Sequence, residues 1–254
     1  MTADIYAGRH RRAGGVGAIR VPRWFSGPVV DRVLAAQVVV IAKEPVPGRV
    51  KTRLTPPFTP AEAAALAEAA LVDTLAAVAG TPVARRVLAL AGVPGRWLPD
   101  GFDVIGQRGA GLDERIAWAF TDAQEMLAAP VVLIGMDTPQ VTPGLLAAAA
   151  EPLVSDTADA TFGMAEDGGF WLLGLRRFDP ALVLGVPMSR PDTGSRQLAR
   201  LEQAGLRIRR LPDLIDVDTV SEAEHVAAAT PGSAFAACMT SLRNGVAQAV
   251  AVAR

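Results

Sequence analysis

Short, continuously apolar segments alternate along the chain with longer segments of helical periodicity. The segments 38–42 and 131–135 are apolar throughout, which is typical of strands buried on both faces of a parallel sheet. Weaker strand signals lie at 86–91, 102–107, 160–164, 170–175 and 207–211. Helical signals fill the intervals, at 60–79, 112–128, from 143 onward, 195–204, 221–229 and 233–254. This order predicts an α/β protein with a mostly parallel, doubly wound sheet and helices on both faces.

Individual residues mark several helix ends. Thr59 is placed to be an N-cap, with Pro60 at the first helical position and Glu62 completing a capping box. Gly80 is placed to end this helix. Thr142 stands before a proline in the same way and predicts a further helix start.

The pattern also suggests how the chain is divided. We expect a flexible basic extension over 1–36, a catalytic domain over 37–230 and an appended helix over 231–254. The less regular stretch 160–191 suggests a hairpin inserted at the sheet edge. The last helix could cover an edge of the core or form a homodimer contact, and the sequence favours neither.

Composition excludes several classes of protein. Half of the 254 residues are hydrophobic, a fifth are charged and the net charge is −1, which excludes disordered and fibrous chains. Nothing in this balance indicates nucleic acid or an acidic membrane as a partner. No apolar run approaches the ~20 residues of a membrane helix. The single cysteine, Cys238, excludes an internal disulfide framework, so we expect a cytoplasmic protein.

The loop after the first strand concentrates positive charge of one kind. Only two of the 25 basic residues are lysines, and both, Lys43 and Lys51, lie in this loop with Thr52 and Arg53. Together with backbone N–H groups, such cations could hold a diphosphate or triphosphate. The glycine spacing fits neither a Walker A loop nor G-x-G-x-x-G. A basic surface loop without a ligand is the alternative, and composition does not separate the two.

Two carboxylates are candidates for a metal site. Asp137 follows the strongest buried strand, where it could hold Mg²⁺ or Mn²⁺ against phosphate oxygens. Asp218 precedes a predicted helix and could be the second ligand. Each has a simpler interpretation, because Asp137 could cap the following turn and Asp218 could be the helix N-cap.

The segment 166–169 joins two apolar strands and carries an acidic pair and two glycines. We expect Asp167 to act as a base or to bind hydroxyl groups. Contacts to a sugar or acceptor are expected from Gly168, Gly169, Trp171 and Ser189. A plain hairpin turn explains the acidic and glycine residues equally well.

Four segments in order resemble one bacterial family. They are 42–54 (AKEPVPGRVKTRL), 135–139 (GMDTP), 166–175 (EDGGFWLLGL) and 216–219 (DVDT). The family is GT-A-like and consists of nucleotide-diphospho-sugar transferase-like proteins, including proposed arsenosugar-biosynthesis glycosyltransferases. It is related to phospholactate guanylyltransferase and molybdenum-cofactor nucleotidyltransferases. The resemblance runs from about residue 38 to residue 225.

The resemblance implies a Rossmann-like GT-A fold and roles for particular residues. By this similarity Lys43, Lys51 and Arg53 would contact phosphates, and Asp137 and Asp218 would bind Mg²⁺ or Mn²⁺. Gln107 and Arg115 lie in a further segment that is similar to the family and would shape the nucleotide pocket.

Three functions follow as hypotheses. The first is a metal-dependent glycosyltransferase that uses a nucleotide-sugar and a small-molecule acceptor and releases a nucleoside diphosphate. The second is a nucleotidyltransferase that joins an NTP to a phosphorylated small molecule and releases pyrophosphate. The third is a non-catalytic nucleotide-binding protein. The resemblance favours the first, whereas the basic loop suits both transferases.

Overall fold

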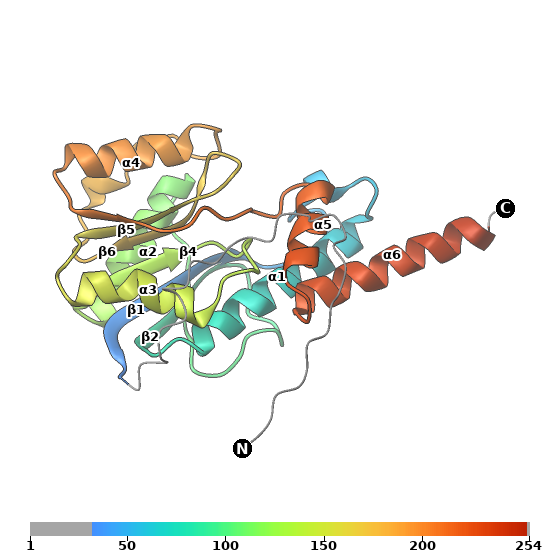
Figure 1. The fold of residues 1–254 in the computed structure, drawn as a ribbon, viewed down its shortest axis with the longest axis horizontal. Helices are drawn as coiled ribbons and strands as arrows, with labels where there is room; N and C mark the ends of the chain where they lie inside the picture. Colours follow the sequence, from blue (N-terminus) through green and yellow to red (C-terminus); the bar gives the residue numbers. More distant parts are fainter. Residues whose placement is uncertain (1–31, 253–254) are drawn as a thin grey trace, which may run out of the picture.

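The computed structural model describes residues 32–252, with side chains for residues 32–244 (Figure 1). Most of the expected basic extension, 1–31, lies outside the described residues. The strands are β1 (Leu34–Lys43), β2 (Val83–Ala91), β3 (Asp103–Gly106), β4 (Val131–Ile134), β5 (Ala160–Met164), β6 (Phe170–Leu175) and β7 (Ile208–Arg210). The helices are α1 (Pro60–Ala79), α2 (Leu112–Met126), α3 (Pro143–Val154), α4 (Thr193–Gln203), α5 (Val220–Ala229) and α6 (Ala234–Val252), with one-turn helices η2 (Thr52–Leu54) and η3 (Pro180–Leu182).

The strands form one seven-stranded sheet in the order β3-β2-β1-β4-β6-β5-β7. Every pairing is parallel except those of β6, which is antiparallel to both β4 and β5. The mostly parallel, doubly wound sheet is therefore confirmed. The expected position of the hairpin was wrong, because β6 lies inside the sheet between β4 and β5, and β7 forms that edge.

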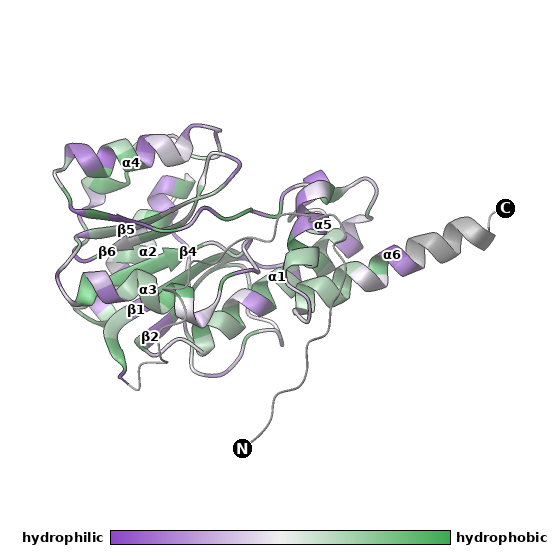
Figure 2. Cartoon of the chain, viewed as in Figure 1, coloured by the Kyte–Doolittle hydropathy of each residue, from purple (hydrophilic) through white to green (hydrophobic). Residues whose placement is uncertain are grey.

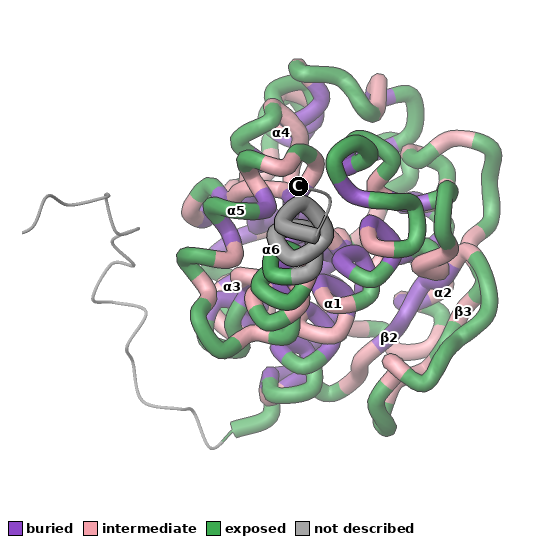
Figure 3. The backbone as a smooth tube through the Cα atoms, turned by 90° about the vertical axis from the view of Figure 1, so that its right-hand side faces the viewer, coloured by how far each residue is buried: buried purple, intermediate pink, exposed green. Residues whose placement is uncertain are grey.

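Helices cover both faces of the sheet because successive residues of the central strand point to opposite sides. Val38 and Val40 of β1 pack with residues of α1 and α3. Val39 packs on the other face with residues of α2 and α4, including Phe120 and Leu201. Figure 2 shows hydrophobic residues along the sheet and a mixture of hydrophilic and hydrophobic ones along α4, and Figure 3 shows the chain coloured by how far each residue is buried.

The helix starts follow the local sequence. The Thr59 hydroxyl accepts the N–H of Glu62 at 3.3 Å, and the Glu62 carboxylate accepts the Thr59 N–H at 2.7 Å, as the capping-box pattern predicts. The hydroxyl of Thr142 accepts the N–H of Leu145 at 3.2 Å and caps α3. These caps satisfy backbone donors that the first helical turn leaves free.

A third apolar cluster lies on the side of α1 that faces away from the sheet. There Leu66 packs with Val226 of α5 and with Phe235 and Met239 of α6. The side chain of Asp73 accepts the first two N–H groups of α6, at 2.9 and 2.8 Å. The start of α6 is thus joined to the body, and the helix then projects from it (Figure 1). No helix within 32–252 is both long enough and apolar enough to cross a membrane.

Candidate functional site

A cavity of about 440 Å³ opens at the carboxyl ends of β1 and β4. From β1 the chain adds β2 and β3 on one side, and it then crosses back to place β4 on the other side. The order of strands therefore reverses between β1 and β4. In open α/β sheets ligands bind at this position, and the volume is typical of small-molecule sites.

Most residues that the sequence indicated as a site line this cavity. They are Lys43, Lys51, Thr52, Arg53, Gln107, Arg115, Asp137, Trp171, Ser189 and Asp218. The fold brings most of them together because they lie at the carboxyl ends of strands or on the loops beside them. Arg115 comes from the first turn of α2, and Trp171 comes from the start of the antiparallel strand β6. Asp167, Gly168 and Gly169 do not line it.

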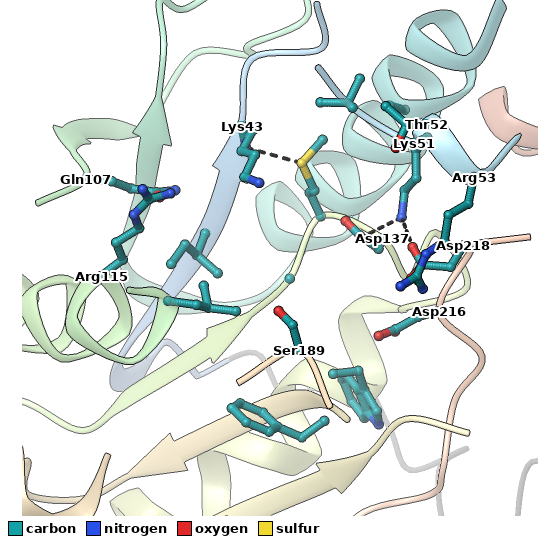
Figure 4. A pocket seen from close by; sticks show the side chains of 18 residues that line it. Lys43, Lys51, Thr52, Arg53, Gln107, Arg115, Asp137, Ser189, Asp216 and Asp218 are labelled. Atoms are coloured by element: carbon teal, nitrogen blue, oxygen red, sulfur yellow. Dashed lines mark hydrogen bonds and ion pairs between the residues drawn. The ribbon is translucent and has the colours of Figure 1, made fainter. Parts of the chain in front are cut away.

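The ammonium group of Lys51 is shared by two carboxylates. It lies 2.6 Å from Oδ2 of Asp137 and 3.0 Å from Oδ1 of Asp218, as Figure 4 shows. Its side chain is only 8% exposed, whereas that of Arg53, 3.3 Å from Asp218, is 75% exposed. Burial alone would lower the pKa of Lys51, but the attraction of Asp137 and Asp218 outweighs it and raises that pKa.

The backbone conformation of Lys51 and a backbone hydrogen bond of Asp137 position the three side chains. Lys51 adopts the left-handed conformation at φ 47° immediately before η2, which costs about 1–2 kcal/mol for a residue with a Cβ. The N–H of Val217 donates to the carbonyl of Asp137 at 3.1 Å. This bond joins the segment after β4 to the segment before α5. Asp137 and Asp218 therefore lie close together although they are far apart in the sequence.

The N-cap of α5 is Thr219 rather than Asp218. The Thr219 hydroxyl accepts the N–H of Glu222, and the Glu222 carboxylate accepts the N–H groups of Thr219 and Asp218, at 2.6 and 2.9 Å. The capping interpretation of Asp218 was therefore wrong. Its carboxylate is instead directed to Lys51 and Arg53.

Asp216 is a cavity residue that the sequence analysis did not single out. It is partly buried, and desolvation together with repulsion from Asp137 and Asp167 raises its pKa to about 8. The alternating pair Asp216 and Asp218 was visible in the sequence. The signal that could have identified Asp216 is this spacing, since both side chains of an extended i, i+2 pair lie on one side of the backbone.

Gln107 and Arg115 lie at the opposite end of the cavity from Lys51 (Figure 4). The amide nitrogen of Gln107 donates to the carbonyls of Ala42 and Ala89, at 2.7 and 2.9 Å, and so joins the ends of β1 and β2. Arg115 donates to the carbonyl of Gly109 at 3.2 Å. Lys43 stands between the two ends in the same view.

Trp171 and Ser189 contribute to the cavity wall in different ways. Trp171 is 2% exposed, and its indole N–H donates to the carbonyl of Pro212 at 3.0 Å, so its polar group is already used within the fold. Ser189 is exposed and adopts φ 57°, a left-handed conformation, at the rim. Ser189 is therefore the more accessible of the two to a ligand.

Asp167 belongs to a second cavity of about 450 Å³ beside the first. This cavity is lined by Glu166, Asp167, Ile215, Asp216, Ser221, Glu222 and His225, and Asp216 lines both cavities. Among the described residues, no lysine or arginine lines the second cavity. The second cavity is therefore acidic where the first is mixed in charge.

The first glycine of the acidic turn has a packing role. Gly168 adopts φ +90°, and a Cβ there would overlap the backbone carbonyl of Pro191. Its own carbonyl accepts the N–H of Gly194 at 2.8 Å. Asp167 accepts the N–H of Gly169 at 2.7 Å, which closes the turn. Gly168 thus allows the turn to pack against the segment that leads into α4.

A cation could be held at the Lys51 carboxylate pair. Within 32–244 no group of three or more His, Cys, Asp or Glu side chains converges as a metal-binding cluster. Two carboxylates, Asp137 and Asp218, do converge on one positive charge. Mg²⁺ is commonly bound through one or two carboxylates together with substrate phosphates and water, so this pair fits a divalent cation that arrives with a phosphate ligand.

Solved structures resemble this chain to different degrees. A protein from Desulfovibrio desulfuricans G20, described as a candidate nucleotide-diphospho-sugar transferase, is 26% identical with a TM-score of 0.76, covering 84% of this chain and 97% of its own. Rv0371c from Mycobacterium tuberculosis H37Rv in complex with manganese is 17% identical (TM-score 0.45; 76% and 98% covered). 2-C-methyl-D-erythritol 4-phosphate cytidylyltransferase from Thermus thermophilus is 16% identical (TM-score 0.46; 77% and 97% covered). The last two similarities are too distant to bear on the site.

The likeness to the Desulfovibrio structure confirms the resemblance to nucleotide-diphospho-sugar transferase-like proteins. No curated protein sequence matches the chain significantly. A family model does match, over residues 64–190, which is half of the chain and includes Asp137, the acidic turn and Ser189. The chain belongs to the bacterial family described as "Uncharacterized protein conserved in bacteria (DUF2064)".

Proposed function

We propose that this protein is a divalent-metal-dependent glycosyltransferase that uses a nucleotide-sugar donor. The observation that carries the proposal is the convergence of Lys51 and Arg53 with Asp137 and Asp218 at the strand-order reversal of the sheet. Paired cations and carboxylates at one point suit a diphosphate and a divalent cation together. The description of the 26% identical Desulfovibrio protein supports the same class of reaction.

The donor would lie along the first cavity. Its diphosphate would bind near Lys51, Thr52 and Arg53, with Asp137 and Asp218 holding Mg²⁺ or Mn²⁺. The nucleoside would extend past Lys43 towards Gln107 and Arg115, at the opposite end of the cavity. Because the amide nitrogen of Gln107 is used within the sheet, its carbonyl oxygen is the group left to accept a hydrogen bond from a base.

The second cavity favours glycosyl transfer over nucleotidyl transfer. Glu166, Asp167, Asp216 and Glu222 line it without any described lysine or arginine. A phosphorylated acceptor would be repelled there, whereas a hydroxyl group or an amine would find hydrogen-bond acceptors. This chemistry suits an acceptor that carries no phosphate. A glycosyltransferase can use such an acceptor, whereas the nucleotidyltransferase hypothesis requires a phosphorylated one.

The reaction then assigns tasks to the residues of both cavities. A hydroxyl oxygen of the acceptor attacks the anomeric carbon, and the bond from that carbon to the diphosphate oxygen breaks. The hydroxyl proton would pass to a carboxylate, and we assign this task to Asp167, which lines the second cavity. The bound cation would neutralise charge on the departing nucleoside diphosphate, and Lys51 and Arg53 would add to that neutralisation. Ser189, at the rim, would bound the space for the sugar and acceptor, and Gly168 and Gly169 would shape the turn that carries Asp167.

Nucleotidyl transfer is the second candidate, and the basic loop is the observation that favours it. Lys43, Lys51 and Arg53 supply three cations along one cavity, which suits a triphosphate. The two reactions differ in their phosphate product. Nucleotidyl transfer releases pyrophosphate, and glycosyl transfer releases a nucleoside diphosphate.

Product analysis therefore tests the proposal. UDP-, GDP-, ADP- and CDP-sugars and the four NTPs are incubated with the protein, Mn²⁺ and a mixture of hydroxyl- and amine-bearing acceptors, and phosphate products are identified by anion-exchange chromatography. We expect a nucleoside diphosphate from one nucleotide-sugar, lost in Asp137→Asn and retained in Asp103→Asn, whose carboxylate pairs with Arg85 outside both cavities. Pyrophosphate from an NTP would establish nucleotidyl transfer instead, and binding without any product would leave a non-catalytic protein.

A further inference from the structure

The strongest unexplained feature of the site is the position of the Lys51 ammonium. It is hydrogen-bonded to Oδ2 of Asp137 and Oδ1 of Asp218, at 2.6 and 3.0 Å, and these are the carboxylates assigned above to the divalent cation. Its side chain is nearly buried, so the pairing is not a loose surface contact. One positive group therefore already lies where a cation bridging the same oxygens would lie.

An ammonium group and a divalent cation cannot both occupy this position. Metal–oxygen bonds are shorter than the contacts of Lys51, about 2.0–2.1 Å for Mg²⁺, so the two charges would be forced close together. At short range like charges repel strongly, and more so where water is partly excluded. The cation can bind both carboxylates only if Lys51 leaves them.

The charges of the site indicate what draws Lys51 away. Among the four side chains that form ion pairs with one another, Lys51 and Arg53 balance Asp137 and Asp218 without any ligand. A divalent cation alone would leave an excess of positive charge, and the dianionic diphosphate of a nucleotide-sugar alone would leave an excess of negative charge. Bound together, they keep the site balanced, and the phosphate oxygens offer Lys51 new acceptors.

We propose that Lys51 is an internal counter-ion that exchanges its carboxylates for the diphosphate, so that metal and nucleotide bind together and the metal alone binds weakly. The inference rests on the proposed function, since it concerns the same diphosphate and cation. Lys51 is in this sense a positioning residue that makes loading of the two ligands cooperative. Because coupling between two ligands is reciprocal, each must raise the affinity for the other by the same factor.

The test measures Mn²⁺ affinity rather than activity. Free Mn²⁺ is followed by electron paramagnetic resonance, with and without UDP, GDP, ADP or CDP, after correction for Mn²⁺ complexes in solution. In the wild type we expect one nucleoside diphosphate to raise Mn²⁺ affinity roughly 10- to 100-fold, within the usual range of coupling. In Lys51→Met we expect Mn²⁺ alone to bind about tenfold tighter than in the wild type, and the coupling to fall to about threefold or less.

Arg53→Met is the matched control. It also removes one positive charge, but the Arg53 side chain is 75% exposed, and among the described residues its ion pair is with Asp218, at 3.3 Å. We expect Mn²⁺ alone to bind this variant within about threefold of the wild type, because exposed ion pairs contribute little. An equal gain in both variants would show a general effect of net charge and would overturn the inference.

The wild type alone also decides the question if Lys51→Met does not fold. Tight Mn²⁺ binding without nucleotide, or coupling below about threefold, would overturn the exchange by Lys51. The proposed function would survive that result, because it is judged by the phosphate product. An absence of Mn²⁺ binding with every nucleoside diphosphate would instead overturn the metal site and the exchange together.

Discussion

Replacing Lys51 by methionine is predicted to destabilise the metal-free protein. Methionine keeps an unbranched apolar side chain of similar length, so the change removes mainly the charge. The two hydrogen bonds of the ammonium, at 2.6 Å to Asp137 and 3.0 Å to Asp218, are lost, and the carboxylates of Asp137 and Asp218 are left without this cation. Removing one partner of a buried ion pair is strongly destabilising, because the charge of the remaining partner is left without a counter-ion.

The size of the effect follows from burial. Each hydrogen bond to a charged group contributes about 1.5–3 kcal/mol, and Lys51 makes two with its side chain 8% exposed. The side chains of Asp137 and Asp218 are 35% and 32% exposed, so water can replace part of the hydrogen bonding that these carboxylates lose. We therefore expect a net loss of about 2–3 kcal/mol, near the lower end for the pair. For a chain of this length that corresponds to a fall of about 4–12 °C in Tm.

Urea denaturation in buffer with EDTA measures this loss, with thermal unfolding as a second readout. Arg53→Met is again the control, and we expect it to change the free energy of unfolding by less than about 0.5 kcal/mol. If Lys51→Met unfolds within about 0.5 kcal/mol of the wild type, the shared ammonium does not stabilise the site and the reasoning from its burial is refuted.

Three further predictions concern separate features. Asp137→Asn should abolish the Mn²⁺-dependent part of the thermal shift given by a nucleotide-sugar, and an unchanged shift would remove this carboxylate from the metal site. In a urea titration, Gly168→Ala should lower the free energy of unfolding by more than about 2 kcal/mol, because the new Cβ would overlap Pro191 in addition to straining the backbone. Gly185→Ala is the control, with φ +78° but open space around it, and should lower that free energy by only about 1–2 kcal/mol. Hydrogen bonds from Arg207 hold the pKa of Asp159 well below its usual range, so Asp159 stabilises the fold above the unfolded pKa of about 3.9 and loses this contribution as pH falls. The stability difference between Asp159→Asn and the wild type should therefore shrink between about pH 5 and pH 3, and a constant difference would contradict the assignment.

Local signals in the sequence predicted most of the fold. The capping box at Thr59 and the cap at Thr142 depend on residues within one helical turn, so the sequence contains all that decides them. The apolar run at 131–135 becomes a strand buried at every position, β4, which is central in the sheet. The order of the strands in the sheet could not be predicted in this way, because it depends on pairing between distant segments. The antiparallel β6 therefore lies between β4 and β5, a place that no local pattern of 160–191 indicates.

The candidate site was predicted in composition but not in its pairings. Residues at strand ends were expected to meet, and Lys51, Asp137 and Asp218 do meet in one cavity. The sequence did not indicate that Lys51 would pair with both carboxylates, because that contact depends on the backbone bond from Val217 to Asp137 and on a left-handed conformation at Lys51. The roles of these residues towards ligands stay proposals.

The acidic turn, 166–169, shows where prediction from the sequence failed. Asp167, Gly168 and Gly169 were expected at the same site as the lysines, yet Asp167 lines a neighbouring cavity and Gly168 packs against Pro191, just before α4. An Asp-Gly-Gly turn has the same local sequence whether it contacts a ligand or another loop. Only the packing of Pro191 against Gly168 distinguishes the two, and that contact is not local.

The most direct test of the central claim is a thermal-shift measurement on the wild-type protein with nucleotide-sugars, each with and without Mn²⁺. A ligand that binds only the folded state raises Tm according to its concentration relative to its Kd. The account predicts that at least one nucleotide-sugar stabilises the protein and that Mn²⁺ increases the shift, whereas Mn²⁺ alone gives little. No shift with any nucleotide-sugar, in the presence or absence of Mn²⁺, would contradict a donor site at Lys51, Asp137 and Asp218.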